Sequence, residues 1–414
     1  MTKFDTISIV GLGYIGLPLA VELACRGHVV YGFDIDQKVV TDTNNATTHY
    51  NEPHLSERLL QARASNKLIA SNILKPADVF VIAVPTPLIK NSEYEHAPDL
   101  TYVRNAIRSI SQVLENNNLI ILESTVPVGT TDLIKTWLKE ENPDFQKVSN
   151  SVLETLDIAF CPERILPGDA LNELINNDRT VGGITEKAAS RAAKFYENFV
   201  NGKITTTNAR TAEMVKLVEN SFRDVNIAFA NEISMIASKY DIDVRTLIEM
   251  ANTHPRVNIL QPGPGVGGHC IAIDPWFLVH DNELDSRLIK TARQTNLKKT
   301  NWTIRRIEHN IDELSNKNTN NLKICFLGLS YKKNVDDLRE SPASKIVEHF
   351  STTLPFDISV IEPHILELPK SFDENVALVR LEDLHNFDLI IKLVDHDCFA
   401  DLKNIKADTV LDYS

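Results

Sequence analysis

IVGLGYIGLPLAVELACRGHVVYGFD, residues Ile9–Asp34, is the stretch that decides the fold: it sets three glycines between an apolar run and a helical pattern. Gly11 allows the tight turn after a strand, and Gly13 lets the backbone approach a pyrophosphate. Gly16 lets the following helix pack on the strand, and the N-terminus of that helix stabilises phosphate charge. The stretch predicts a strand–turn–helix–strand unit that binds a dinucleotide.

The acid that ends the second apolar run, Asp34, indicates which dinucleotide binds. A carboxylate there accepts both ribose hydroxyls of NAD and repels the 2′-phosphate of NADP. Backbone N–H groups of Tyr14 and Ile15 are expected at the pyrophosphate. Thr86 in VPTP and Thr125 in ESTVPVG end two later strands and are predicted to face the cofactor, although threonine before proline is also an ordinary turn pattern. NAD is therefore the predicted cofactor.

Short apolar runs alternate with helical patterns twice along the chain. The first set is ISIVGLG, VVYGFDID, VFVIAVPTP, LIILESTVPVG and DIAFCPERI; the second is NLKICFLGLSYK, FDISVIEPH, FDLIIKLVDHD and TVLDYS. Wholly apolar strands between helices are typical of a parallel sheet covered on both faces. We expect an α/β protein with two Rossmann-like doubly wound domains joined by a long central helix. The expected domains are 1–205 for NAD, 206–310 for dimerisation and catalysis, and 311–414 for a nucleotide sugar.

Residues 207–240 contain no proline or glycine and predict one helix of roughly 32 residues, about 48 Å long at 1.5 Å per residue. A helix of this length bridges domains or forms a subunit interface, and we expect a homodimer. Lys216, Asn220 and Arg223 follow i, i+4, i+7 spacing and so share one face. Apolar residues flank them, which favours a lined cleft, although a solvated face shows the same spacing.

The stretch QPGPGVGGHCIAIDPWF, Gln261–Phe277, places Cys270 after a run of glycines. The thiol is either a nucleophile or an ordinary buried sulfur; a cation such as Lys216 would favour the thiolate. Asp274 could orient a water or the lysine, whereas His269 is expected to point outward. With NAD, a nucleophilic cysteine allows oxidation of an alcohol past the aldehyde to the carboxylate. Lys216 and Asn220 are suited to stabilise the alkoxide and oxyanions.

Bulk composition excludes several classes of protein. The chain has 414 residues, 43% apolar and 24% charged, and a formal net charge of −13, which argues against a nucleic-acid partner. Its 5 cysteines are widely spaced without a CxxC pair, so we expect neither a disulfide framework nor a metal site. No signal-peptide pattern opens the sequence and no apolar run reaches membrane-spanning length, so we expect a cytoplasmic protein without a membrane partner.

These motifs together resemble the UDP-glucose/GDP-mannose dehydrogenase family over the whole chain. The segments CPERILPG, RTAEMVKLVENSFRDVNIAFANE, HPRVNILQPGPGVGGHCIAIDPWF and YKKNVDDLRESPA are most similar to members that oxidise UDP-N-acetyl-D-mannosamine. The resemblance implies NAD-dependent four-electron oxidation at C6 for surface polysaccharide synthesis.

The resemblance also implies residue roles. Cys270 would be the nucleophile and Lys216 the acid/base group, with Asn220, Asp274, Thr125 and Glu163 in support. Arg339 would contact the cofactor from the second Rossmann-like domain. The implied substrate contacts are Arg164, Ile165, Lys216, Asn220, Arg223, His254, Arg256, Gly267 and Lys332, of which His254 and Arg256 could reach a neighbouring subunit's substrate.

Two features depart from the family pattern. UDP-glucose dehydrogenases carry PEFLREG, whose second glutamate helps hydrolysis, but here PERILPG places Pro167 at that position. Glu163 remains, Thr125 or Asp274 would then position the water, and UDP-glucose is disfavoured as substrate. The chain also stops at LDYS, where family members usually continue, so we expect either a less complete edge to the nucleotide site or a trimmed sequence.

Other functions stay open. UDP-N-acetylglucosamine or UDP-glucose is an alternative substrate. A two-electron β-hydroxyacid dehydrogenase would also have a Rossmann domain, a long helix and a Lys/Asn pair, but needs no glycine-flanked cysteine. A catalytically silent nucleotide-sugar-binding protein is the alternative of another class, although such proteins usually lose the nucleophile or the lysine.

Overall fold

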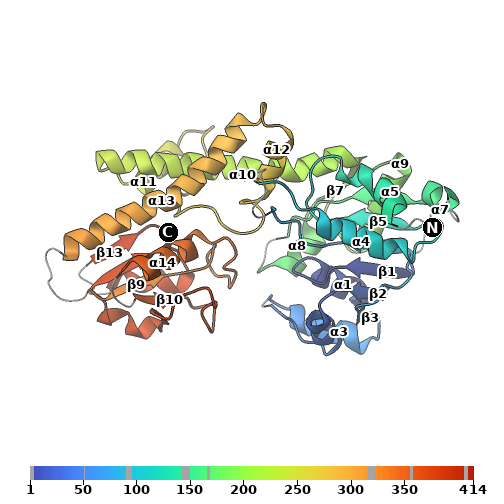
Figure 1. The fold of residues 1–414 in the computed structure, drawn as a ribbon, viewed down its shortest axis with the longest axis horizontal. Coiled ribbons are helices and arrows are strands. Elements are labelled where there is room, and N and C mark those ends of the chain that lie inside the picture. The colour runs from blue at the N-terminus through green and yellow to red at the C-terminus, as the bar shows by residue number, and fades with distance from the viewer. Residues whose placement is uncertain are drawn as a thin grey trace. The chain divides into compact units, whose positions relative to one another are not determined.

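The computed structural model describes residues 4–50, 52–89, 96–141, 150–165, 168–315, 322–354, 358–404 and 409–414. The chain forms two compact units. The first comprises Met1–Glu219 and Trp276–Asp281, and the second comprises Asn220–Pro275 and Asn282–Ser414. Each unit is built around one sheet (Figure 1).

The sheet of the first unit has the strand order β3-β2-β1-β4-β5-β6-β7-β8. The strands are β1 (Thr6–Val10), β2 (Val29–Phe33), β3 (Leu68–Ser71), β4 (Val79–Ile82), β5 (Leu119–Leu122), β6 (Asp157–Phe160), β7 (Arg179–Gly183) and β8 (Ile204–Asn208). All neighbours are parallel except β6 and β7. The first six strands have the doubly wound order that binds a dinucleotide where the order reverses, between β1 and β4.

Helices cover both faces of this sheet because successive strand residues point to opposite sides. Ile9 packs in a core with α1 (Gly16–Cys25), α2 (Gln37–Asn44), α3 (Leu55–Ala64), α8 (Ala170–Asn176) and α9 (Glu186–Tyr196). Val10 packs in the opposite core with α4 (Thr101–Ser111), α5 (Thr130–Glu141) and α7 (Asn150–Thr155). Burial on both faces explains why the strands read as unbroken apolar runs.

The sheet of the second unit is smaller and wholly parallel, in the order β11-β10-β9-β12-β13. Its strands are β9 (Ile324–Leu327), β10 (Ile358–Ile361), β11 (Val376–Leu378), β12 (Leu389–Lys392) and β13 (Thr409–Asp412). α13 (Arg287–Ser315) and α14 (Pro342–Thr353) cover one face. The 3₁₀ segments η2 (Leu381–Asn386) and η3 (Asp397–Asn404) cover the other. The remaining helices are η1 (Ser238–Tyr240), α11 (Val244–Ala251) and α12 (Asp274–Asp281).

The long helix α10 runs without interruption from Ala209 to Ala237. It begins two residues later than the sequence indicates, because Thr207 is still paired with Gly182 in the β7–β8 ladder. Asn208 then accepts the backbone N–H of Thr211 at 2.9 Å and caps the helix. The β-branched run before it favours a strand over a helix. The prediction of two Rossmann-like domains with a long central helix is confirmed.

Candidate functional site

The three glycines of the opening motif have separate steric reasons. Gly11 has φ +97°, and a Cβ there would lie 2.6 Å from the carbonyl oxygen of Ala83. A Cβ on Gly16 would lie 1.8 Å from the carbonyl oxygen of Gly11, so the helix packs directly on the turn. A Cβ on Gly13 would meet nothing within 4 Å. This open side, at the N-terminus of α1, fits a pyrophosphate that needs close backbone approach.

Asp34 lies at the end of β2, beside this turn. Its Oδ2 accepts the backbone N–H of Leu12 at 2.8 Å, which ties the acid to the glycine turn. Tyr14 packs its ring against Tyr50 with centroids 4.2 Å apart. Ile15 is the N-cap residue of α1 and makes no side-chain cap, and in the first turn the N–H of Leu17 donates to the carbonyl oxygen of Gly13 at 3.1 Å. These positions fit the adenosine half of NAD.

The loops after β4 and β5 are joined by a residue that the motif analysis missed. Ser124 Oγ accepts the N–H of Val84 at 3.0 Å and donates to its carbonyl oxygen at 2.7 Å. This bond places Thr86 and Thr125 at the carboxyl ends of adjacent parallel strands. Glu213 of α10 holds the segment after Thr125 by accepting the N–H of Gly129 at 2.6 Å. The signal for Glu213 was a charged residue inside an apolar helix.

Glu163, in the loop after β6, is the centre of a hydrogen-bond network. Its Oε1 accepts the N–H groups of Arg164 at 2.5 Å and Ile165 at 2.7 Å. Its Oε2 pairs with Arg179 at 2.8 Å, and both side chains are buried. Its carbonyl oxygen accepts a hydrogen bond from Nζ of Lys216. Because three donors occupy the carboxylate, Glu163 is built to hold this loop against Lys216.

The side chain of Arg164 is also engaged within the unit. Its guanidinium contacts Glu219 at 2.7 Å and donates to the carbonyl oxygen of Asp178 at 3.0 Å. A substrate at this loop would therefore meet the main chain of Arg164 and Ile165. Pro167, which stands where UDP-glucose dehydrogenases have a second glutamate, lies outside the described residues.

A second buried acid, Glu123, lies near Glu163 and was not foreseen. Its Oε1 accepts the hydroxyl of Tyr196 at 2.6 Å, and its side chain is buried. Burial and the charge of Glu163 raise the pKa of Glu123 to about 7, although Arg179 and the Tyr196 bond oppose them. Burial also raises the pKa of the Cys161 thiol nearby to about 12. Arg179 is the one cation among these five residues, and it pairs with Glu163, so Glu123 keeps a protonated fraction near neutral pH that an ordinary carboxylate would not have.

This acid predicts a specific pH dependence of stability. Because its pKa is raised on folding, the proton on Glu123 stabilises the native state fully below the unfolded pKa of about 4.5. That contribution is lost as the pH rises to about 7. Glu123→Gln cannot ionise, so its Tm should rise relative to wild type between pH 5 and 7.5. Thermal melts of both proteins across this range measure the difference; a difference independent of pH would show that Glu123 does not titrate there.

Asn220 and Asp274 hold the turn that carries Cys270 in the second unit. Asn220 Nδ2 donates to Asp274 Oδ2 at 2.5 Å, and both side chains are buried. The N–H groups of Ile273 and Asp274 donate to the carbonyl oxygen of Cys270 at 3.0 and 2.8 Å. Cys270 itself is half-buried at the start of this turn. These bonds fix the turn that carries Cys270, and the support of the thiol by Asn220 and Asp274 stays a prediction.

The glycines before Cys270 pack against their own chain. A Cβ on Gly267 would lie 2.7 Å from Cβ of Tyr331, and a Cβ on Gly265 would lie 2.3 Å from Oγ1 of Thr300. The N–H of Gly268 donates to the carbonyl oxygen of Arg339 at 3.0 Å. Close packing against Tyr331 and Thr300 thus accounts for the lack of a Cβ at Gly267 and Gly265, and the predicted approach of Gly267 to substrate stays a prediction.

The other predicted contacts lie on accessible surface. Arg223, His254 and Arg256 are exposed, as is His269, in keeping with its expected outward direction. Arg339 pairs its guanidinium with Asp337 through two bonds of 2.8 and 2.6 Å. Lys332 is partly exposed, and its carbonyl oxygen accepts the hydroxyl of Ser330 at 2.7 Å.

The second sheet repeats the turn of the first. Gly328 has φ +87°, and its N–H bonds to the last residue of β10 as that of Gly11 bonds to the last residue of β2. Glu362 accepts the N–H of Leu329 at 2.8 Å, as Asp34 accepts that of Leu12. Here, however, the acid is buried beneath His396, 3.2 Å away.

Glu362, His364 and His396 also bring ligand atoms within 4.8 Å of one another, a geometry open to a metal ion. His396 Nδ1 accepts the N–H of Asn334 at 2.9 Å, so Nε2 carries the proton and faces Glu362. A metal on that nitrogen would require its deprotonation. Burial raises the pKa of Glu362, but the hydrogen bonds from His396 and Leu329 outweigh it and lower that pKa. The cluster is better explained as a set of hydrogen bonds that holds the turn after β9 in place.

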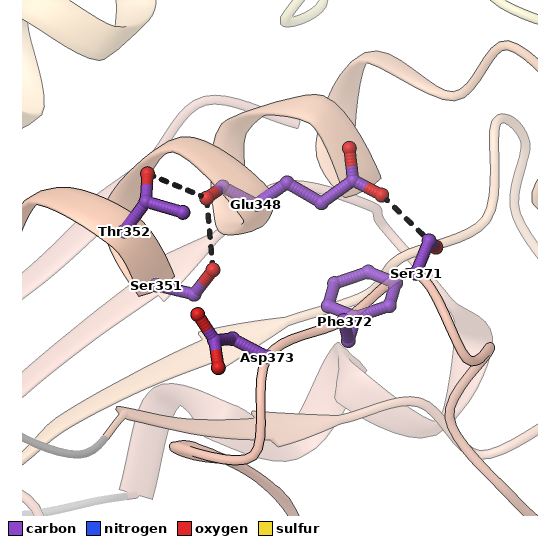
Figure 2. Close-up of a pocket in the computed structure, with 6 residues that line it drawn as sticks. All are labelled: Glu348, Ser351, Thr352, Ser371, Phe372 and Asp373. Carbon is purple, nitrogen blue, oxygen red and sulfur yellow. Dashed lines mark hydrogen bonds between the residues drawn. The ribbon is translucent and has the colours of Figure 1, made fainter.

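Two hollows in the second unit contain none of the predicted site residues. Figure 2 shows one of about 230 Å³, where Glu348, Ser351 and Ser371 are joined by hydrogen bonds. The other, of about 460 Å³, lies between α10, α11, α13 and the end of β13. Lys299 lines it, donates to Ser234 at 2.6 Å, and has its pKa lowered to about 8 by burial.

Comparison with known protein families covers the whole architecture. The models of the UDP-glucose/GDP-mannose dehydrogenase family match its NAD binding domain at residues 5–200, its central domain at 210–298 and its UDP binding domain at 325–414. The chain belongs to this family. The dehydrogenase therefore takes NAD as its cofactor, and the glycine turn and Asp34 are the residues that fit it.

Named relatives are similar over nearly their full length. The UDP-N-acetyl-D-mannosamine dehydrogenase of Escherichia coli K12 is 47% identical over 99% of this chain and 97% of its own. An NDP-N-acetyl-D-galactosaminuronic acid dehydrogenase of Ralstonia nicotianae is 47% identical over 96% and 92%. The structure of UDP-D-ManNAc dehydrogenase from Pyrococcus horikoshii has a TM-score of 0.86 at 37% identity, covering 99% of this chain and 95% of that one.

A search of the helices in the described part of this dehydrogenase finds no segment long and apolar enough to cross a membrane. All five cysteines lie in the described part, and no two of them form a disulfide.

Proposed function

We propose that the protein oxidises UDP-N-acetyl-D-mannosamine at C6 to UDP-N-acetyl-D-mannosaminuronate, in the supply of surface polysaccharide. The observation that best supports this proposal is the 47% identity to the E. coli enzyme over 99% of the chain. The half-buried Cys270, on a turn fixed by Asn220 and Asp274, supports a covalent route. NAD accepts the hydride in each of two successive oxidations.

Cys270 carries the carbon between the two oxidations. After the primary alcohol is oxidised to the aldehyde, the thiolate adds to the carbonyl carbon to give a thiohemiacetal. Loss of a second hydride gives a thioester, and water then cleaves the C–S bond, releasing the carboxylate and the thiol. Each sugar thus consumes two NAD and one water and yields two NADH.

Side chains around Cys270 are assigned by charge and hydrogen bonding. Lys216, held by the carbonyl oxygen of Glu163, supplies positive charge to the alkoxide and to the oxyanions. Asn220 is a further donor, while Thr125 or Asp274 positions the hydrolytic water. Arg164, Ile165, Arg223, Lys332, Gly267, His254 and Arg256 remain the proposed substrate contacts, and Thr86 and Arg339 remain proposed cofactor contacts.

The substrate is tested by measuring NADH formed from pure nucleotide sugars. We expect two NADH per UDP-N-acetyl-D-mannosamine and the highest kcat/KM with that sugar. The Ralstonia relative favours UDP-N-acetylgalactosamine as a second candidate, so that sugar is assayed with UDP-N-acetylglucosamine and UDP-glucose. One NADH per sugar would exclude the thioester route, and no NADH with any sugar would indicate a silent binding protein.

We also propose a cytoplasmic homodimer. Phe222, Phe229 and Ile236 lie along one side of α10 and are 68%, 50% and 45% exposed. A row of exposed large apolar side chains along a helix is typical of a protein interface. Light scattering at micromolar concentration should give twice the chain mass of 46.5 kDa; a mass of one chain would contradict the dimer.

A further inference from the structure

The loop that carries Cys270 is fastened at two points by buried polar side chains of the second unit. Upstream, the N–H of Gly263 donates to Asn231 Oδ1 on α10 at 3.0 Å. Downstream, Arg293 Nη1 on α13 donates to the carbonyl oxygen of Ile271 at 3.5 Å. Ile271 directly follows Cys270, so the second fastening acts on the nucleophile's own peptide segment.

The two fastenings belong to one hydrogen-bond chain between α10 and α13. Asp224 Oδ1 accepts Arg293 Nη1 at 2.5 Å and Asn296 Nδ2 at 2.7 Å. Asn231 Nδ2 in turn donates to Asn296 Oδ1 at 2.9 Å. Asp224 and Asn231 are 0% exposed, and Arg293 and Asn296 are 1% exposed. A continuous, dry polar chain thus joins Gly263 to Ile271.

Stability alone gives little reason for such a chain. A buried ion pair usually stabilises a fold no more than apolar side chains of the same volume do. Among the described residues, Asp224 Oδ2 and Arg293 Nε have no hydrogen-bond partner, which adds a desolvation cost. Buried polar groups do fix geometry, because only one arrangement satisfies their directions.

We propose that Asp224, Asn231, Arg293 and Asn296 are positioning residues that hold the Cys270 loop in the orientation needed for attack on the substrate carbonyl. They act through Gly263 and Ile271 and do not touch the reacting atoms. The inference rests on the proposed role of Cys270. It adds that the rate depends on a polar chain behind the loop, on the side away from solvent.

The decisive variant replaces both charges, Asp224→Leu with Arg293→Met, so that no buried charge is left unpaired. We expect its Tm to stay within a few degrees of wild type. Amide hydrogen exchange at residues 263–274 should become about tenfold faster, since the downstream fastening is lost. kcat with UDP-N-acetyl-D-mannosamine should fall by about 10- to 100-fold with the affinity for NAD unchanged.

Lys299→Met is the matched control, because Lys299 is a buried cation of α13 that also bonds to α10 but not to the loop. It should keep wild-type exchange at residues 263–274 and wild-type kcat. If the paired variant fails to fold, Asn231→Leu removes the bonds to Gly263 and Asn296 and leaves the ion pair between Asp224 and Arg293. It should speed exchange near Gly263 and lower kcat by about three- to tenfold.

Wild-type exchange and kcat in the paired variant would overturn the proposal. So would faster exchange spread evenly over the unit with a lowered Tm, which would indicate a purely structural ion pair. The exchange measurement needs no substrate. If wild-type enzyme formed no NADH with any sugar, the proposed function would fail while the fastening of the loop would still be decided.

Discussion

Replacing Cys270 with alanine is expected to lower steady-state NADH formation by about 10³-fold or more. Without the thiol, the aldehyde has no covalent holder between the two oxidations and no route to a thioester. The affinity for NAD should be unchanged, because the glycine turn and Asp34 belong to the other unit. The absorbance of NADH, followed over many turnovers, measures the fall in rate.

Cys398→Ala is the matched control, since Cys398 is exposed and lies on η3, away from every proposed site residue in sequence. It should keep the wild-type rate. Full activity in Cys270→Ala would remove Cys270 from the reaction and leave a two-electron alcohol dehydrogenase as the simpler function.

Lys216→Met is expected to lower kcat and kcat/KM together by about 10²- to 10³-fold. The positive charge of the ammonium meets a negative partner only when the alkoxide or an oxyanion forms. Its removal therefore raises the energy of the transition state more than that of the bound substrate. The variant loses the hydrogen bond from Nζ to the carbonyl oxygen of Glu163. The ion pair between Glu163 and Arg179 still holds that loop, so the variant should fold normally. Steady-state kinetics with circular dichroism checks both points.

Lys239→Met, which removes an exposed lysine just beyond α10, should leave both constants unchanged. A rise in KM with unchanged kcat in Lys216→Met would assign Lys216 to ground-state binding of the sugar nucleotide. Lys216→Arg should recover little activity, because a planar guanidinium does not replace a compact ammonium.

Local patterns predicted the parts of the fold and site that depend on local chemistry. The turn at Gly11, the packing of Gly16 and the acid Asp34 follow from steric and charge rules within one strand–helix–strand unit. Asn220 and Asp274 were singled out near Cys270 from helix spacing and the motif, and they are hydrogen-bonded to each other. The predicted start of α10 was wrong by two residues, because strand pairing with β7 outweighed helical propensity.

The parts not predicted depend on contacts between distant segments. Glu123 and Tyr196 are joined across 73 positions, and Glu163 and Arg179 meet through the folding of β7 beside β6. No sequence periodicity identifies such pairs, because each residue is only a single polar side chain within an apolar segment of the sequence. The packing of Gly267 against Tyr331 is likewise a contact between distant segments that the sequence does not show.

The repeated turn in the second unit shows that one backbone pattern can serve two different purposes. Gly328 and Glu362 reproduce the backbone pattern of Gly11 and Asp34, yet His396 stands on the carboxylate that would otherwise face a ribose. The imidazole of His396 thus occupies the carboxylate of Glu362, which in this sheet holds the turn instead of a ribose. Calorimetric titration should accordingly count one NAD per chain, although the chain contains two copies of the architecture that receives it.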